Sequence, residues 1–522
     1  MAGNNSMDEH ERKVVVEFCH LLEKSKQLFN GLRDLPQYGH KQWQAYFGRT
    51  FDIYTKLWKF QQQHRYYARF IVVCLLLNKK KYVRELVQEL DAQIADYSST
   101  YEPDDQVEWN LVLDEIKAFV KAESAVGVLD ADTNAPIVLT HRLGPLTSPP
   151  VERSPPMCLS LQEILIIGNQ TDQVKFSELS MDMFRMLQTL EREPRDDPNH
   201  LHDASPAGRM PFRPGPYPME NGAPRRDNPH KYLLYKPTYS QILVFLASGF
   251  KELPANGALL LYLSADGCFS SVKRPEESEF YTAGYDLGGV ATSAKNEHGP
   301  GKRGAGGGGI AGGGGSIGGP GIGPVPGGKD HHCIYPGDLY PFTRKPLFIV
   351  VDSDNSFVYQ QIPRFFGQPL MVLMSPQDTP AGLRELRHAG SLFTLFLHSP
   401  LAAFCLICNV ASLQFHHWER CQRYVEQFLV EACRLVLRSR CESSVIQFFG
   451  DDFLRLLLLR YVFCDVVLHL HRSFRGRQQR PRCHPPLPEA DVLEHPSLHH
   501  LVLDLASCLD ARDHFPDSNE LA

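Results

Sequence analysis

Apolar residues in the first quarter of the chain recur at the spacing of an amphipathic helix. Val15, Phe18 and Leu22 lie three or four residues apart, and an aromatic series from Trp43 to Trp58 continues the pattern. This period places apolar side chains on one face of a helix, where neighbouring helices cover them. We therefore predict successive helices over residues 11–124, with the aromatic series packed in a helical core rather than lining a peptide groove.

The middle of the chain has a different pattern, with short apolar runs that do not alternate with polar residues. The runs cover residues 258–263, 347–351 and 370–374, and each ends in polar turn residues. Continuous apolar runs suit strands that are buried on both faces of a parallel sheet. A helix is expected to start near Tyr239, and two more are expected at 161–167 and 176–193.

The last part of the chain returns to helical periodicity. From Ser391 onward the main expected helices are 418–437, 445–471 and 498–509. The predicted fold is thus mixed α/β and all-α: an N-terminal helical region with tetratricopeptide-like helix pairs, a central α/β unit with a mainly parallel sheet, and a C-terminal helical region.

Composition divides the chain further. Residues 193–230 are rich in Pro, Arg, Asp and Gly and predict a disordered linker, and the glycine-rich tract at 299–328 cannot bury enough apolar surface to order itself. The expected division is a helical region at 8–192, this linker, an α/β unit at 231–390 with a disordered insertion at about 268–335, and a helical region at 391–512.

Charge and cysteine content limit the classes of function. The chain has 522 residues, 43% of them hydrophobic, and a net charge of -6, so it lacks the positive field that direct nucleic-acid binding requires. Its 13 cysteines are odd in number and scattered, and no secretory signal precedes them. These features predict a globular protein of a reducing, intracellular compartment.

Several motifs closely resemble the suppressor of cancer cell invasion family, and together they span nearly the whole chain. They are SKQLFNGLRDLPQYG at 25–39, DQVEWNLVL at 105–113, QVKFSEL at 173–179, NPHKYLLYKP at 228–237, PGDLYPFTRKP at 336–346 and QFFGDDFLR at 447–455.

The resemblance implies a transcriptional corepressor of the nucleus and cytoplasm. Such a protein restrains myocardin-related coactivators of serum response factor, downstream of Rho and formin signalling, and limits cell migration. The family is also linked to a chromatin-associated mediator of DNA repair. The resemblance implies no enzyme activity, no catalytic, cofactor-binding or metal-binding residues, and no direct contact with nucleic acid.

The chain departs from the family at the junction of Arg65 and Tyr66. Relatives carry several helices between the motifs that abut here. Loss of stacked helices would expose apolar faces that neighbours normally cover, unless a continuous helix crosses the junction.

Three carboxylates are the best candidates for chemistry. Asp352 and Asp354 follow the second apolar run and Asp266 follows the first, at the strand ends where α/β sheets place ligands. The alternative is structural, because Asp, Ser and Asn also cap helices, here one leading toward Phe365. The structural interpretation is favoured, and a metal-dependent hydrolase stays as an alternative.

Other motifs fit structural explanations better than functional ones. They are the GxxxxGK letters at 323–330, which lack the Ser or Thr of a phosphate-binding loop; Cys405 and Cys408 in an apolar run; His331, His332 and Cys333; Cys483 and His484; and the LxxLL letters at 454–458. The last motif is an arginine cluster of Arg472, Arg475, Arg477, Arg480 and Arg482. We expect it in a solvated loop that could contact an import factor or an acidic partner.

The apolar run at 391–413 is long enough to span a bilayer. Polar residues and Pro400 interrupt it, which favours a buried helical hairpin broken at Ser399 and Pro400. A membrane-associated adaptor remains the other alternative, disfavoured by these residues.

Overall fold

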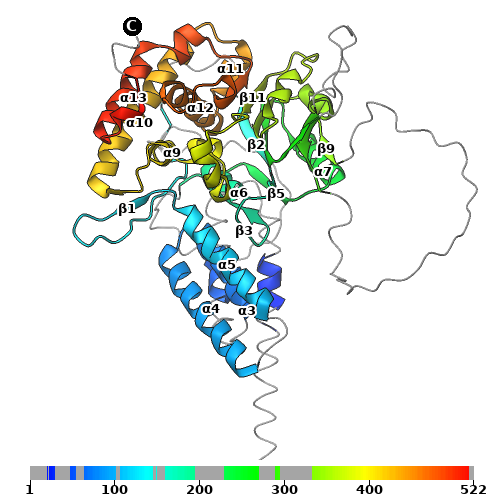
Figure 1. The fold of residues 1–522 in the computed structure, drawn as a ribbon. Coiled ribbons are helices and arrows are strands. Elements are labelled where there is room, and N and C mark those ends of the chain that lie inside the picture. The colour runs from blue at the N-terminus through cyan, green and yellow to red at the C-terminus, as the bar shows by residue number, and fades with distance from the viewer. Residues whose placement is uncertain are drawn as a thin grey trace, which may run out of the picture.

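The computed structural model describes residues 20, 23–29, 48–54, 64–101, 106–144, 148–149, 159–193, 228–269, 288–293 and 332–516 (Figure 1). The glycine-rich tract at 299–328, the GxxxxGK letters and most of the linker expected at 193–230 lie outside these residues.

Six strands form one mixed sheet, in the order β13-β11-β10-β6-β2-β5. Their bounds are β2 (Ser160–Asn169), β5 (His230–Tyr235), β6 (Gly257–Ala265), β10 (Leu347–Asp352), β11 (Leu370–Met374) and β13 (Arg482–His484). All neighbours are parallel except β11 and β13. The prediction that the three apolar runs form one mainly parallel sheet is confirmed, since they are β6, β10 and β11.

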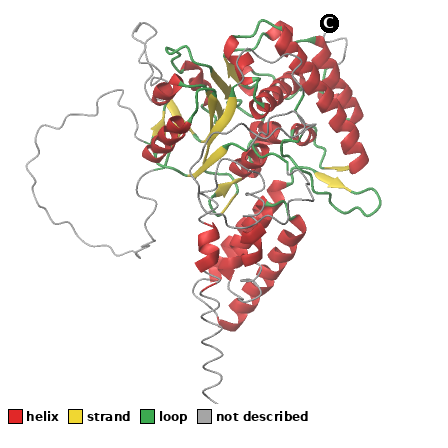
Figure 2. Ribbon diagram, turned by 180° about the vertical axis from the view of Figure 1, so that it is seen from behind, coloured by secondary structure: helices red, strands yellow, loops and turns green. Residues whose placement is uncertain are grey.

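Helices cover both faces of this sheet (Figure 2). Along β6, Leu260 and Tyr262 contribute to the core that includes α6 (Met181–Thr189) and the C-terminal helices, whereas Leu261 and Leu263 contribute to the core beneath α7 (Tyr239–Glu252). Alternate side chains of a strand point to opposite faces, so a strand covered on both sides needs an unbroken apolar sequence.

The helix expected at 161–167 is wrong, because these residues lie in β2, which is paired with β5 on one side and β6 on the other. A continuous apolar run does not distinguish a buried strand from a buried helix, and Ile164, Ile166 and Ile167 are β-branched residues that favour strands. The helix expected at 176–193 is shorter than predicted, since α6 covers only Met181–Thr189 after the small hairpin of β3 (Lys175–Phe176) and β4 (Leu179–Ser180).

The C-terminal helical region is confirmed. Its helices are α8 (Leu392–His398), α9 (Pro400–Ile407), α10 (Phe415–Arg438), α11 (Ser443–Phe448), α12 (Asp452–Leu470) and α13 (Pro496–Cys508), joined by a π-helical turn at Glu489–Leu493 and a 3-10 turn at Arg477–Gln479. Helix α12 is apolar nearly all round and lies in the middle of the group, so Leu454, Leu457 and Leu458 of its LxxLL letters are core residues.

The apolar run at 391–413 is a buried pair of helices with a break at Ser399 and Pro400, as predicted. The break frees carbonyl groups of α8, and the buried Arg460 of α12 donates to the carbonyls of Leu397 and His398 at 2.7 and 2.9 Å. Within the described part of the chain, no helix is long and apolar enough to cross a membrane.

The N-terminal helices α3 (His64–Leu76), α4 (Lys80–Tyr101) and α5 (Gln106–Glu123) form a separate apolar cluster, which also includes Phe176 and Phe184. Helix α3 begins at His64 and continues past Arg65 and Tyr66 without a break, so the junction itself lies within one helix.

Short elements complete the structure. A three-stranded sheet joins β7 (Gly267–Phe269), β8 (Gly288–Ala291) and β9 (Cys333–Ile334), and β1 (Gly127–Leu129) pairs with β12 (Ser412–Gln414). Besides Arg477–Gln479, the described residues form 3-10 helices at Pro336–Arg344, Ser356–Gln361, Ala381–Ala389 and Arg512–His514. Cys268 and Cys333 form a disulfide that the scattered cysteines did not predict.

Candidate functional site

The order of the parallel strands identifies one edge of the sheet as the place for a ligand. Across the sheet, β5, β2, β6, β10 and β11 come second, first, third, fourth and fifth in the chain. This is a common order of doubly wound sheets, in which ligands bind beyond the carboxyl ends of the strands where the order reverses. Here the reversal lies between β2 and β6.

A cavity of about 560 Å³ lies beyond the carboxyl ends of these strands. Asp352 and Ser353 from the end of β10 line it, together with Ser375 after β11, Gln173 after β2, and Ser391 at the start of α8. Its size falls within the range of small-molecule pockets. The sheet edge therefore carries a cavity at the position that the strand order indicates.

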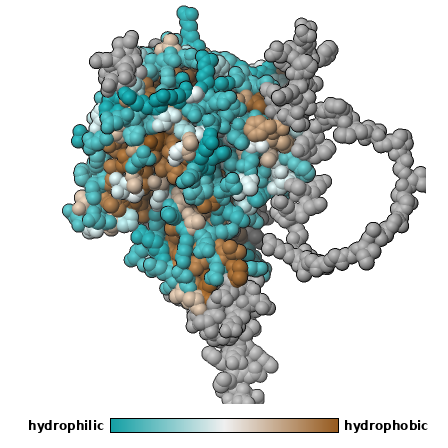
Figure 3. Space-filling view, in the orientation of Figure 1, coloured by the Kyte–Doolittle hydropathy of each residue, from teal (hydrophilic) through white to brown (hydrophobic). Residues whose placement is uncertain are grey.

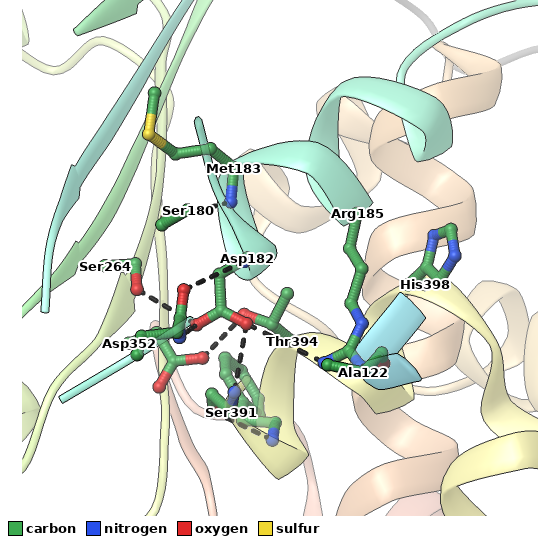
Figure 4. Close-up of polar contacts among 12 residues, drawn as sticks. Ala122, Ser180, Asp182, Met183, Arg185, Ser264, Asp352, Ser391, Thr394 and His398 are labelled. Carbon is green, nitrogen blue, oxygen red and sulfur yellow. Dashed lines mark hydrogen bonds and ion pairs between the residues drawn. The ribbon is translucent and has the colours of Figure 1, made fainter. Parts of the chain in front are cut away.

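Asp182, in the first turn of α6, is a central residue of this edge (Figure 4). One carboxylate oxygen accepts hydrogen bonds from Gln173 Nε2 at 2.7 Å and Ser264 Oγ at 3.0 Å. The other oxygen accepts from the backbone N–H of Ser391 at 2.9 Å. Asp182 thus ties the ends of β2 and β6 to the start of α8.

Asp352 lies beside this network and is also buried. Thr394 Oγ1 donates to Asp352 Oδ2 at 2.6 Å, so the Tyr262 hydroxyl, 2.6 Å from the same Thr394 oxygen, is the donor in that contact. Burial and the nearby charge of Asp182 raise the pKa of Asp352 to about 7, against the lowering effect of the Thr394 hydrogen bond. Asp352 can therefore gain or lose a proton near neutral pH.

Arg185 supplies a buried positive charge next to the two carboxylates. Its Nη2 donates to the carbonyl of Ala122 at 3.1 Å, and its Nη1 lies 3.9 Å from Asp182 Oδ1, while Nε and Nη1 make no hydrogen bond. Burial lowers the pKa of Arg185, and the charge of Asp182 acts in the opposite direction. Gly390 packs against this pair with a φ of +105°, and a Cβ there would come within 2.9 Å of Asp182 Oδ1.

Of the three carboxylates singled out in the sequence, Asp352 and Asp354 line the cavity and Asp266 does not. Only Asp352 joins the network, because Asp354 Oδ1 accepts from the backbone N–H of Gly267 at 2.6 Å, and Asp266 accepts from Thr171. The expected helix capping is also wrong: the 3-10 helix at Ser356–Gln361 has no side-chain cap, and Asn355 instead donates to backbone carbonyls of the neighbouring small sheet. Asp354 and Asp266 hold loops at the sheet edge.

Sequence reasoning missed Asp182, Arg185 and Thr394. The signal that could have found them is the acidic first turn of α6 following Ser180, which caps this helix by accepting from the Met183 N–H.

The assembled sheet edge can bind a small polar molecule and exchange a proton with it. It combines a cavity, a carboxyl group that titrates near neutrality, and fixed hydrogen-bond donors.

The remaining candidate motifs have structural roles in the described residues. Burial raises the pKa of both Cys405 and Cys408 to about 12, as expected for inert packing thiols. Cys483 is buried within β13.

The arginine cluster is partly built into the structure rather than wholly solvated. Arg480 pairs with the buried Asp465 at 2.9 Å, Arg482 stacks over Phe357, and Arg472 Nε donates to the carbonyl of Phe515.

Comparison with known proteins gives one consistent result. The family model described as Protein SCAI matches residues 20–65 and 63–474, and the two matches meet at the junction where missing helices were expected. The mouse protein named Protein SCAI is 43% identical over 586 aligned positions, which cover 98% of this chain and 91% of the relative. The human Protein SCAI is 42% identical with the same coverage, and a Dictyostelium discoideum Protein SCAI homolog is 29% identical over 720 positions, covering 97% of this chain and 91% of the relative. No solved structure matches.

Proposed function

Because the chain belongs to the Protein SCAI family, we propose that it is a transcriptional corepressor that acts through protein–protein contacts. Its proposed target is the complex of serum response factor with myocardin-related coactivators, downstream of Rho and formin signalling, and its effect is to limit cell migration. The observation that carries this proposal is the family match, which covers nearly all of this chain and of its mouse and human relatives.

The arrangement of the carboxylates supports an interaction protein rather than an enzyme. Asp354 and Asp266 each accept hydrogen bonds from nearby loop residues, and Asp182 accepts three that join structural elements. A hydrolytic metal site would need such groups to converge on one point. We therefore propose that repression does not depend on catalysis at this edge.

The proposed location and partners of the protein also follow from its membership of the family. We propose that it works in the nucleus and is also present in the cytoplasm, with a chromatin-associated repair mediator as a further partner. The net charge of -6 supports contact with proteins rather than with the phosphate backbone of nucleic acids. Figure 3 shows apolar areas on an otherwise largely hydrophilic face of the described residues. Apolar surface of this kind becomes buried when two proteins bind each other.

A reporter assay tests the proposal directly. Expression of the full chain in the nucleus should lower the output of a serum-response-factor reporter, and the coactivator should co-precipitate with the chain. The double variant Asp352→Asn and Asp354→Asn should repress as well as the wild type, because Asn keeps the size and hydrogen-bonding oxygen of Asp and removes its charge. As a control for folding, Leu457→Asp places a charge in the core of α12 and should abolish repression.

Two results would contradict the proposal. If the folded, nuclear wild-type chain leaves the reporter unchanged, the family role does not hold for this chain. If the double Asn variant stays folded and still binds the coactivator but no longer represses, a reaction at the sheet edge is required, and the hydrolase alternative gains support.

A further inference from the structure

Two helices of the C-terminal region bring together three side chains that suit a soft metal ion. His417 and Cys421 lie one turn apart on α10, and Cys508 is the last residue of α13, which packs beside α10 (Figure 1). The Cys421 and Cys508 sulfur atoms are 3.4 Å apart, and one donor atom from each of the three residues lies within 4.8 Å of the others. Among the described residues, no other group of three His, Cys, Asp or Glu side chains meets this criterion.

The donor atoms are close to the spacing that tetrahedral zinc requires. Zinc binds thiolate sulfur at about 2.3 Å and imidazole nitrogen at about 2.0 Å, so neighbouring ligand atoms around it lie about 3.5–3.8 Å apart. The sulfur atoms are 3.4 Å apart, slightly closer than this, and the donor atoms of the set all lie within 4.8 Å of one another, so the side chains would shift when they bind the ion. Thiolate and imidazole ligands favour zinc over magnesium or calcium, which prefer oxygen.

The local structure already holds the His417 ring close to Cys508. Residues four apart on a helix share one face, which places His417 above Cys421. The His417 ring is held by a contact of 2.7 Å between its Nε2 and the carbonyl oxygen of Cys508. A backbone carbonyl that fixes the imidazole is a regular companion of metal-binding histidines, and it leaves the second ring nitrogen with a lone pair.

We propose that His417, Cys421 and Cys508 form a binding site for one Zn²⁺ ion, with water as the fourth ligand. His417 and Cys508 are partly exposed, whereas Cys421 is buried, so the ion is reached from solvent on one side only. Binding forms two zinc–sulfur bonds and one zinc–nitrogen bond and releases the two thiol protons to water, so the occupied site carries no net charge.

The metal would also change how the two helices are joined. Without a cation, the Cys421 and Cys508 sulfur atoms are in hydrogen-bond contact with each other. A zinc ion between α10 and α13 would join two helices that are otherwise held together mainly by apolar contacts.

Metal content and cobalt spectroscopy of the full chain test the proposal. Chain purified under reducing conditions and dialysed against zinc should retain one zinc per chain by elemental analysis. Loading with Co²⁺ should give the absorption of thiolate-to-cobalt charge transfer. Cys508→Ser and Cys421→Ser should abolish that absorption, and His417→Ala should weaken zinc affinity at least about tenfold.

Cys405→Ser and Cys408→Ser are the matched controls, because they remove one buried thiol within the adjacent α9 and one directly after it, and should leave one zinc bound. Circular dichroism of each variant separates loss of the metal from loss of the fold, and Cys508 is the safer test because it is partly exposed. The proposal is overturned if the folded wild type binds no zinc, if cobalt gives no thiolate absorption, or if folded Cys508→Ser binds zinc like the wild type. A disulfide between Cys421 and Cys508 that persists in place of zinc would also overturn it.

Discussion

The buried carboxyl group of Asp352 should make the stability of this protein fall as the pH rises through neutrality. Its pKa is about 7 in the folded chain, against 3.8 for an unperturbed side chain. A carboxyl group whose pKa is raised by folding stabilises the fold fully below the unfolded value, and this stabilisation is lost as the pH rises through the folded value. The window of loss therefore runs from about pH 4 to just above pH 7.

The size of the effect follows from the shift. One pKa unit corresponds to about 1.4 kcal/mol, so a shift of about three units corresponds to about 4 kcal/mol in total, as an order of magnitude. About 2–3 kcal/mol of this is lost between pH 5 and pH 8. Asp352→Asn removes the ionisation while its side-chain oxygen can still accept the hydrogen bond from Thr394.

Scanning calorimetry of the full chain at several pH values between 5 and 8 measures this effect. The melting temperature of Asp352→Asn relative to wild type should rise by about 4–6 °C from pH 5 to pH 8, since 1 kcal/mol shifts the melting temperature of a large domain by roughly 2 °C. Asp354→Asn is the matched control, because it removes the charge of a half-buried carboxylate two residues away and should leave the pH dependence unchanged. A difference between Asp352→Asn and wild type that stays constant over this range would refute the reasoning, because Asp352 would then be ionised throughout.

Three further variants test other parts of the structure. Gly390→Ala should destabilise the fold by about 1–3 kcal/mol in calorimetry, because φ is +105° and the new Cβ would crowd Asp182 Oδ1; an unchanged melting temperature would contradict the positive φ. Arg480→Ala should cost about 3 kcal/mol by leaving Asp465 buried and unpaired, and adding Asp465→Asn should restore part of this; no recovery would mean that the ion pair is not the cause. A chain with the family's additional helices restored at the Arg65–Tyr66 junction should resist limited proteolysis better than this chain, and equal resistance would show that the short N-terminal unit is already complete.

The sequence predicts those parts of the fold whose cause is local. Strands β6, β10 and β11 were found because a strand covered on both faces must be apolar throughout, and the break at Pro400 was found because proline lacks an N–H group. Strand β2 was missed because its mostly apolar sequence, which contains Glu163, fits a buried helix as well as a buried strand. Its position between β5 and β6 is decided by the sheet and not by its own residues.

The candidate sites depend on contacts between distant parts of the chain, and this is why the sequence analysis found one residue of the sheet-edge site and none of the proposed zinc site. Asp352 was found because it ends a recognisable strand, whereas Asp182 meets it only because β2 and β6 are neighbours in the sheet. In the same way, Cys405 and Cys408 attract attention by their spacing but lie in the core, while Cys421 meets Cys508 across 87 residues. Short spacing fixes which residues share a helix face, and only the packing of α10 on α13 determines what that face meets. For this chain, pairs of reactive side chains should therefore be sought between packed elements, where burial and a fixed neighbour can change their chemistry.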